Sequence, residues 1–406
     1  MKIAIIGTYP PRQCGIATFT CDLYKSLIHS SDEKPTIVAL SDGSESYFPT
    51  EVSIIIEKDK IESYRRAAKL INNSFDVCII QHEYGIFGGE AGNFILDFAQ
   101  ALSIPIVSNL HTVLSEPNPT EMEVLQQLVK CSNKVTVMTK RAIGMLESIY
   151  HINRTKIALI PHGVPQFSHE HEQAKKNLGL ENKKIMLSFG FLGPNKGLET
   201  AIEAVAAVNC PNFIYVILGS THPNVLRNEG ESYRQSLQER AKGLGIADKV
   251  QFINCFASEE LLIQYLSACD IYVTPYPHEN QISSGTLSFA IGAGAAVIST
   301  PYWYAKDLLG EDRGLLFDFK NQKALSLLIN QLLEDPQLLA KYRKNAANYG
   351  RHMSWTNVGK MQLQLLAELV QFHEARKNTR LLPTSISGIA RDFPLTLKSI
   401  QNKLSS

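Results

Sequence analysis

Two segments that lie far apart in the chain share one pattern: a short apolar run, a turn that contains glycine, and the start of a helix. The first runs from Lys2–Gly7 into Gly15, and the second runs from Ile185–Gly190 into Gly197. A helix that begins after a parallel strand presents free backbone N–H groups and the positive end of its dipole, which suits a phosphate group. The pattern therefore predicts two nucleotide-type domains whose anion-binding turns face one cleft.

Short runs rich in Val and Ile recur along the chain, with amphipathic segments between them. One such segment places Phe19, Leu23 and Leu27 on a single stripe at helical spacing. Repeated alternation of this kind predicts an α/β fold with a right-handed, doubly wound parallel sheet in each half. The expected strands are residues 2–7, 35–40, 76–81, 105–110, 133–138 and 156–160, then 185–190, 213–219, 249–253, 270–274, 295–299 and 314–317.

The alternation divides the chain into an N-terminal Rossmann-like domain, residues 1–164, and a C-terminal one, residues 165–354. The stretch 165–183 is polar and lacks periodicity, which indicates a linker. Helical patterns continue to about residue 377, and residues 378–406 form a tail. The apolar stripe of the tail leaves two alternatives open, an ordered arm or a loosely attached amphipathic segment.

The bulk composition is that of a folded, water-soluble protein. The 406 residues include 40 basic and 39 acidic ones, for a net charge of +1, so no nucleic-acid surface is expected. Seven scattered cysteines include no Cys-x-x-Cys pair, which favours free thiols in a reducing cytoplasm. We expect neither a secretory signal, because the first residues read as a strand, nor a membrane span, because no apolar run approaches the roughly 20 residues that one needs. We expect a cytoplasmic protein, with contact between the tail and the inner membrane face as an open alternative.

Four segments in a fixed order carry a resemblance to a known family. They are Gly190–Gly197, Ala268–Pro275, Gly292–Thr300 and the aromatic residue Trp355. Together they resemble the retaining glycosyltransferases of family 4, also described as glycosyl transferases group 1, which have the GT-B fold of two Rossmann-like domains facing a central cleft. The resemblance extends from Met1 to about residue 375. It implies that the helix over about 355–377 crosses back to the first domain.

The resemblance implies transfer of a hexose from a nucleotide-diphosphate sugar to a hydroxyl of a glycan, a lipid-linked or a small-molecule acceptor. It also implies retention of the anomeric configuration, with no metal and no other cofactor. The sequence agrees on the metal, because it contains no His-x-x-x-His and no Asp-x-Asp motif.

Three residues are the candidate catalytic groups. Lys196, at a helix start, is placed to neutralise a leaving diphosphate, although a solvated lysine is the simpler alternative. The resemblance implies that His111, at a strand end, contacts the transferred sugar. It assigns the hydroxyls of that sugar to Glu279 when counted from Pro275, whereas counting back from Gly294 selects Gln281.

The donor-binding residues implied by the resemblance are Gly15, Arg12, Gly190, Ser283, Ser284, Gly285, Thr286, Gln281 and His222. The serines and Thr286 also read as an ordinary helix N-cap. Two departures from the family pattern concern this set. Phe191 stands where the family has an arginine, which makes Arg12 a candidate substitute, and Ser288 or Phe289 stands where it has a second, ribose-binding glutamate.

His82, Glu83 and Tyr84 follow a predicted strand and precede a double glycine, which suggests an acceptor-side loop. A polar turn that caps the next helix is the alternative interpretation. For the whole chain, two other functions stay open: a catalytically silent GT-B protein that binds a sugar or nucleotide, and a retaining glycoside phosphorylase. A dinucleotide oxidoreductase ranks last, because neither glycine turn reads Gly-x-Gly-x-x-Gly.

Overall fold

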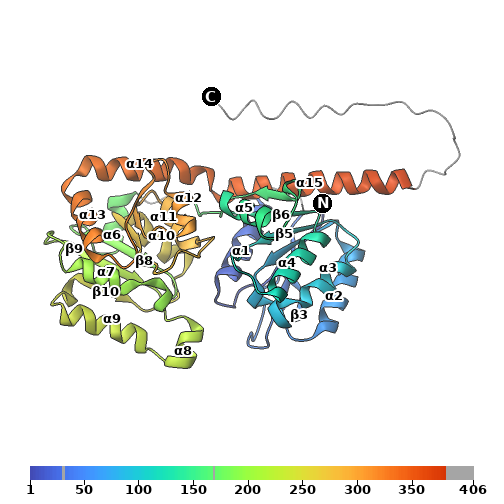
Figure 1. The fold of residues 1–406 in the computed structure, drawn as a ribbon, viewed down its shortest axis with the longest axis horizontal. Coiled ribbons are helices and arrows are strands. Elements are labelled where there is room, and N and C mark those ends of the chain that lie inside the picture. The colour runs from blue at the N-terminus through green and yellow to red at the C-terminus, as the bar shows by residue number, and fades with distance from the viewer. Residues whose placement is uncertain (30–32, 168–169, 381–406) are drawn as a thin grey trace.

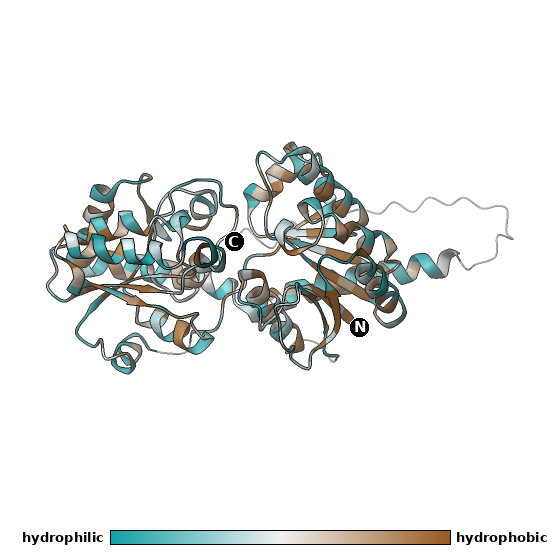
Figure 2. Ribbon diagram, turned by 90° about the horizontal axis from the view of Figure 1, so that it is seen from below, coloured by the Kyte–Doolittle hydropathy of each residue, from teal (hydrophilic) through white to brown (hydrophobic). Residues whose placement is uncertain are grey.

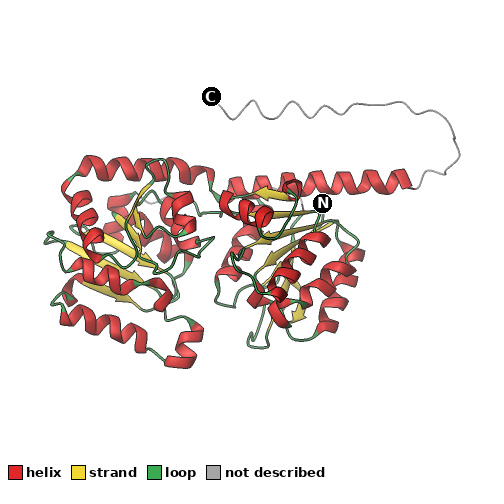
Figure 3. Ribbon diagram, viewed as in Figure 1, coloured by secondary structure: helices red, strands yellow, loops and turns green. Residues whose placement is uncertain are grey.

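The computed structural model describes residues 1–29, 33–167 and 170–380, and shows two lobes side by side (Figure 1). One lobe holds a seven-stranded parallel sheet in the order β3-β2-β1-β4-β5-β6-β7, and the other a six-stranded parallel sheet in the order β10-β9-β8-β11-β12-β13. Helices lie on both faces of each sheet (Figure 3). The predicted α/β fold of two doubly wound domains is confirmed.

The first lobe comprises strands β1 (Ile3–Gly7), β2 (Thr36–Ser41), β3 (Val52–Glu57), β4 (Val77–His82), β5 (Ile106–Leu110), β6 (Lys134–Val137) and β7 (Ile157–Leu159), with helices α1 (Gly15–Ile28), α2 (Ile61–Ser74), α3 (Phe94–Ala101), α4 (Pro119–Cys131) and α5 (Lys140–Ser148). Six of these strands were predicted. The missed strand, β3, lies at the sheet edge, where Ser53 and Ile55 are exposed, so its sequence lacks the continuous apolar run of a buried strand.

The second lobe comprises strands β8 (Lys184–Phe189), β9 (Phe213–Leu218), β10 (Val250–Ile253), β11 (Ile271–Thr274), β12 (Ala296–Ser299) and β13 (Gly314–Leu316). Its helices are α6 (His171–Asn177), α7 (Leu198–Val205), α8 (Pro223–Glu229), α9 (Ser232–Gly243), α10 (Glu259–Ala268), α11 (Gly285–Gly292), α12 (Trp303–Leu308), α13 (Gln322–Glu334) and α14 (Pro336–His352). All six strands were predicted. The expected linker 165–183 instead contains α6, a short helix whose single buried apolar residue, Ala174, leaves no periodic signal.

The strands form the core of each lobe because helices exclude water from both sheet faces. All five residues of β1 and all six of β9 are buried. Figure 2 shows these apolar strands between helices whose outer sides are polar. Such sheets read in the sequence as continuous Val and Ile runs, which is why their positions were predictable.

The chain passes between the lobes twice at one place. Val164 leaves the first lobe, and its backbone bonds to Met353 (N to O, 2.8 Å) and to Trp355 (O to N, 2.9 Å) on the returning segment. From Trp355, helix α15 (Trp355–Arg380) runs along the first lobe (Figure 1), and its Leu366 is fully buried in that lobe's core. Across the described residues, no helix is both long and apolar enough to span a bilayer. The predicted tail beyond residue 380 lies outside the described residues.

Candidate active site

A cleft of about 730 Å³ lies between the lobes and is lined by residues of both. Its walls contain the start of α1 and the carboxyl ends of β4 and β5 on one side, and the ends of β8 and β9 with the starts of α10 and α11 on the other. Gly15 and Lys196, from the two predicted anion-binding turns, both line it. The predicted site residues on the walls are Gly15, Glu83, His111, Gly190, Lys196, His222, Ser283, Gly285 and Thr286.

The first turn opens α1 toward the cleft. Cys14 caps the helix, with its Sγ 3.4 Å from the backbone nitrogen of Ala17 and 3.2 Å from Thr8 Oγ1. A Cβ on Gly15 would meet no atom within 4 Å, so protein packing does not require glycine there. The open space above Gly15 leaves the backbone accessible to a bound molecule.

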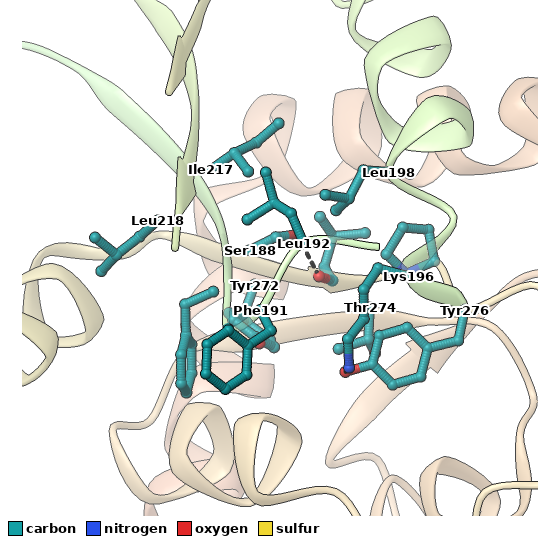
Figure 4. A pocket seen from close by; sticks show the side chains of 14 residues that line it. Ser188, Phe191, Leu192, Lys196, Leu198, Ile217, Leu218, Tyr272, Thr274 and Tyr276 are labelled. Carbon is teal, nitrogen blue, oxygen red and sulfur yellow. Dashed lines mark hydrogen bonds between the residues drawn. The ribbon is translucent and has the colours of Figure 1, made fainter. Parts of the chain in front are cut away.

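The second turn is formed by closely packed glycines. Gly197 has φ +62° and a Cβ there would lie 2.2 Å from the carbonyl oxygen of Pro275, while a Cβ on Gly219 would lie 1.9 Å from that of Gly190. Only glycine fits such backbone approaches. This packing brings Lys196 over Tyr276, with its Nζ 4.6 Å from the ring centroid and 3.4 Å from the hydroxyl (Figure 4).

Tyr276 joins the lysine turn to the loop after β11, and it was missed in the sequence. It is buried, stacks on Tyr302 at 4.9 Å, and lies 3.0 Å from Thr286 Oγ1. Burial raises the pKa of Tyr276, but the Lys196 ammonium and the hydrogen bonds with Thr286 and Ser284 together outweigh this effect, and the net shift is downward. An aromatic residue after a strand is a weak signal, because most such residues only fill the core.

The start of α11 forms the floor of the cleft next to Lys196. Ser284 Oγ accepts from the backbone of Leu287 at 3.3 Å and caps the helix, so Ser284 is buried rather than on the wall. Ser283 Oγ donates to the carbonyl oxygen of His111 at 3.0 Å, which connects the two lobes across the cleft. Gly285 and Thr286 are left facing the cavity.

His111 is held as a neutral ring at the end of β5. Its Nε2 lies 2.8 Å from Gln81 Oε1, and Asn109 donates to the same oxygen at 3.5 Å while accepting from Thr136. This chain of donors assigns the proton of His111 to Nε2. Burial, assisted by neighbouring histidines, lowers the pKa of His111 to about 3. At neutral pH the ring therefore offers hydrogen bonding and an edge against Phe19, but no charge.

Glu83 is the acidic residue on the same wall. Its carboxylate accepts from Thr112 Oγ1, and burial raises its pKa despite this bond and one from the Tyr84 backbone. His82, by contrast, is fully buried behind the wall between Tyr84 and Phe87, and Tyr84 is buried with its hydroxyl 3.4 Å from the carbonyl of Glu121. The prediction of an acceptor-side loop therefore holds in its placement only for Glu83, because alternate residues leaving a strand face opposite sides.

Like Ser284, the catalytic candidate Glu279 and the donor-binding candidates Arg12 and Gln281 lie off the cleft wall. Arg12 pairs with Asp42 at 2.8 Å and with Glu45 at 3.4 Å, outside the cleft lining. Glu279 is 54% exposed and faces Lys306 at 3.9 Å. Gln281 donates its amide to the carbonyl of Ser283 at 3.0 Å.

The loop itself explains these last two placements. The carbonyl of Glu279 accepts from the backbone nitrogens of Gln281 (2.7 Å) and Trp303 (3.0 Å). These bonds fold the loop against the start of α12, away from the cavity. The spacing of residues in the sequence does not indicate that the loop folds in this direction.

Aromatic residues occupy the two positions where the family pattern has charged ones. Phe191 packs between His222 at 5.4 Å and Phe256 at 5.5 Å. Phe289, rather than Ser288, faces the cleft and packs on His162 at 5.9 Å, whereas Ser288 is buried against Tyr304. This part of the wall is thus apolar.

Asp22 is a further carboxyl on the wall that the sequence did not reveal, because it reads as an outward-facing helix residue. Its side chain is 13% exposed and lies 4.0 Å from Lys25, which in turn pairs at 2.9 Å with Glu259 of the opposite lobe. Burial, with a smaller effect of Glu259, raises the pKa of Asp22 to about 7, although Lys25 and Trp355 act in the opposite direction.

Histidine titration predicts loss of stability in mild acid. Burial lowers the pKa of His82 and of His162 to about 4, and that of His111 to about 3. The unfolded chain binds protons at these sites below about 6.5 and the folded chain does not, so their contribution is present above pH 6.5 and is lost as the pH falls toward 4. We therefore expect the urea concentration at the unfolding midpoint to decrease when the pH is lowered from 7.5 to 5.0.

In the variant His82→Leu the midpoint should decrease less with pH, because one buried titrating ring has been removed. Both ring nitrogens of His82 lack a hydrogen-bond partner, so the substitution breaks no hydrogen bond of the ring. The exposed His352→Leu serves as the control and should behave as the wild type. An unchanged pH dependence in His82→Leu would contradict this assignment.

A Rossmann-like lobe on each side of a cleft, with the predicted anion-binding turns of both facing it, is the arrangement of the GT-B fold. Residues 170–352 match the family model of glycosyl transferases group 1. Over this stretch, which makes up most of the second lobe, the chain is similar to glycosyltransferases of group 1.

Two curated relatives show how far the similarity extends. A D-inositol 3-phosphate glycosyltransferase of Corynebacterium urealyticum is 26% identical over 255 residues, which are 60% of this chain and 58% of the relative, less than two thirds of its length. The mannosylfructose-phosphate synthase of Agrobacterium fabrum is 22% identical over 393 residues, 87% of this chain and 84% of the relative.

Solved structures agree on the fold. Anabaena HepE in complex with UDP and glucose superposes with a TM-score of 0.72 at 17% identity, covering 91% of this chain and 100% of that one. The sucrose-phosphate synthase of Thermosynechococcus elongatus gives a TM-score of 0.74 at 16% identity, covering 91% and 99%.

Proposed function

We propose that the protein transfers a hexose from a nucleotide-diphosphate sugar to a hydroxyl of a glycan, a lipid-linked or a small-molecule acceptor, with retention of configuration and without a metal. One observation carries the proposal: Lys196, the start of α11 and the open turn at Gly15 line one cleft between the lobes. Each can bind phosphate oxygens, and the cleft is large enough for a nucleotide sugar.

The chemistry follows from where charge develops during transfer. As the bond between the sugar and the diphosphate breaks, negative charge grows on the diphosphate, and Lys196 with the backbone amides near Gly285 would stabilise it. Neutral His111 would hydrogen-bond the sugar from the opposite wall. The donor phosphate itself would take the proton of the acceptor hydroxyl.

The nature of the donor is supported by solved neighbours, because HepE structures were obtained with UDP, with UDP and glucose, and with UDP-glucose. Uridine diphosphate sugars are therefore the first probes. We expect UDP and a cognate nucleotide sugar to raise the unfolding temperature, since a ligand at 100 times its Kd stabilises the folded state by about 2.7 kcal/mol.

Turnover is then followed by NMR, which reports the anomeric configuration of the product, in buffer with and without EDTA. Retained configuration and EDTA-insensitive rates are the expected results. An inverted product, or activity lost with EDTA and restored by a divalent cation, would contradict those parts of the proposal.

A catalytically silent GT-B protein is the second candidate function. Three observations favour it: Phe191 and Phe289 occupy positions that the family pattern gives to charged residues, and Glu279 faces away from the cleft. Calorimetry distinguishes the two. Tight nucleotide-sugar binding, with neither transfer nor donor hydrolysis for any sugar tested, would establish the silent protein.

A further inference from the structure

The ionisable groups of the cleft are unusual for a site that handles several phosphates. Its described lining contains three carboxyl residues, Asp22, Glu83 and Glu259, against two lysines, Lys25 and Lys196, and no arginine. Phosphate sites in proteins typically use arginine or lysine, whose charge and donors match the phosphate oxygens. The cleft as a whole is therefore poor in cations.

Neither lysine is free to bind a phosphate group of the acceptor. Lys196 lies beside Tyr276 and the start of α11, the place proposed for the donor diphosphate. Lys25 pairs with Glu259 at 2.9 Å across the cleft. The three histidines on the wall do not add charge at neutral pH, because burial lowers the pKa of His111 to about 3 and that of His162 to about 4, and also lowers that of His222.

The first-lobe wall, which is left for the acceptor, is acidic. Glu83 and Asp22 both face the cavity from this lobe, and among the described residues of this wall Lys25, which is paired, is the only cation. A phosphate monoester carries about −1.5 to −2 charges at neutral pH. Because burial raises the pKa of Asp22 to about 7, this carboxyl is only partly ionised at neutral pH. Placing a phosphate monoester beside the Glu83 carboxylate and the remaining charge of Asp22, with a donor diphosphate already bound, is electrostatically unfavourable.

We infer that the acceptor is a neutral, polyhydroxylated compound and that the cleft excludes phosphorylated sugars. Carboxylates suit such an acceptor, because each accepts hydrogen bonds from sugar hydroxyls. Glu83, held by Thr112, is the residue we assign to this role, with Asp22 on the same lobe as a second acceptor of hydrogen bonds. The inference rests on the proposed function, since it concerns the acceptor of that reaction.

The test compares matched pairs that differ only in a phosphate: glucose with glucose 6-phosphate, and mannose with mannose 6-phosphate. Each is titrated into the full chain saturated with UDP, and thermal stabilisation reports binding whether or not transfer occurs. Initial rates with UDP-glucose as donor are measured in parallel. We expect no saturable binding of either sugar phosphate in the millimolar range, and kcat/KM at least about 100-fold higher for any neutral sugar that is used.

A sugar phosphate that binds the UDP-loaded protein saturably, or that accepts hexose as well as its neutral partner, would overturn the inference. Failure of the proposed function has a different signature, namely no transfer and no hydrolysis from any nucleotide sugar. The binding arm still decides whether phosphate is excluded in that case.

A charge-neutral variant tests whether the charge of Glu83 causes the exclusion of sugar phosphates. Glu83→Gln keeps the shape and removes the charge, so inhibition by glucose 6-phosphate should strengthen about 10-fold while use of neutral sugars declines. The exposed Glu116→Gln is the matched control and should leave both unchanged. If Glu83→Gln discriminates against the phosphate as strongly as the wild type, the assignment to Glu83 is wrong.

Discussion

Replacing Lys196 with alanine should lower kcat for sugar transfer by about 100- to 1,000-fold, the range found when one preorganised group that stabilises transition-state charge is removed. The ammonium group lies 3.4 Å from the Tyr276 hydroxyl and at the cleft, so its loss removes a full positive charge next to the proposed diphosphate site. Donor saturation should not restore the rate, because the charge on the leaving group is greatest in the transition state.

The comparison uses Lys323→Ala, an exposed lysine on α13, which should retain the wild-type kcat. Thermal unfolding of both variants excludes a loss of folding as the cause. Unchanged turnover of Lys196→Ala at saturating donor would remove this lysine from the mechanism.

Replacing Asp270 with alanine should reduce the free energy of unfolding of the second lobe by about 3–5 kcal/mol, the usual cost of breaking a buried ion pair. Asp270 and Lys175 are 3% and 4% exposed, and the atoms Oδ2 and Nζ lie 2.8 Å apart. Asp270 also accepts from the backbone of Ile185 and from His171. The substitution leaves the Lys175 ammonium buried without its counter-ion.

The double variant Lys175→Met/Asp270→Leu separates this cause from a simple packing defect. It removes both charges and should recover most of the stability, because an apolar pair of similar volume often replaces a buried ion pair without loss. Urea denaturation measures all three proteins. A double variant as unstable as Asp270→Ala would show that the ion pair is not the reason.

Asp270 also makes the stability of the protein depend on pH in strong acid. Burial alone raises the pKa of Asp270, but hydrogen bonds from His171, Lys175 and the Ile185 backbone, together with the Lys175 charge, outweigh it and hold the pKa at about 2, below its ordinary 3.8. Its contribution to stability is therefore present above about pH 4 and is lost as the pH falls toward 2.

The architecture was predictable because most of its determinants are local. Buried parallel strands need continuous apolar runs, and twelve such runs were recognised at nearly the observed positions. The edge strand β3 and the short helix α6 were missed, since each is half solvated and lacks the burial that produces a clear pattern. The motifs from Gly190 to Thr300 further indicated the family, which the comparison with residues 170–352 confirms.

The candidate site was predictable only where position along a strand or helix sets the direction of a residue. Gly15, His111 and Lys196 follow strand ends or begin helices, so their arrival at the cleft follows from the parallel topology. Arg12 and Glu279 also lie in such loops, yet their side chains point away from the cleft. Arg12 pairs with Asp42, and Glu279 faces Lys306 in a loop that backbone hydrogen bonds fold away from the cavity. The catalytic or binding roles of all five residues stay predictions.

Apolar periodicity, glycine turns and motif order thus specified two parallel sheets and the sheet edges that line the cleft. The charge balance of the cleft was decided by tertiary structure alone. Asp22 comes from a helix, Glu83 from a strand end and Glu259 from the other lobe, and they share one cavity only after both lobes have packed. Local sequence determines backbone direction through hydrogen bonding and burial, whereas electrostatics depends on distances between residues that are remote in the chain.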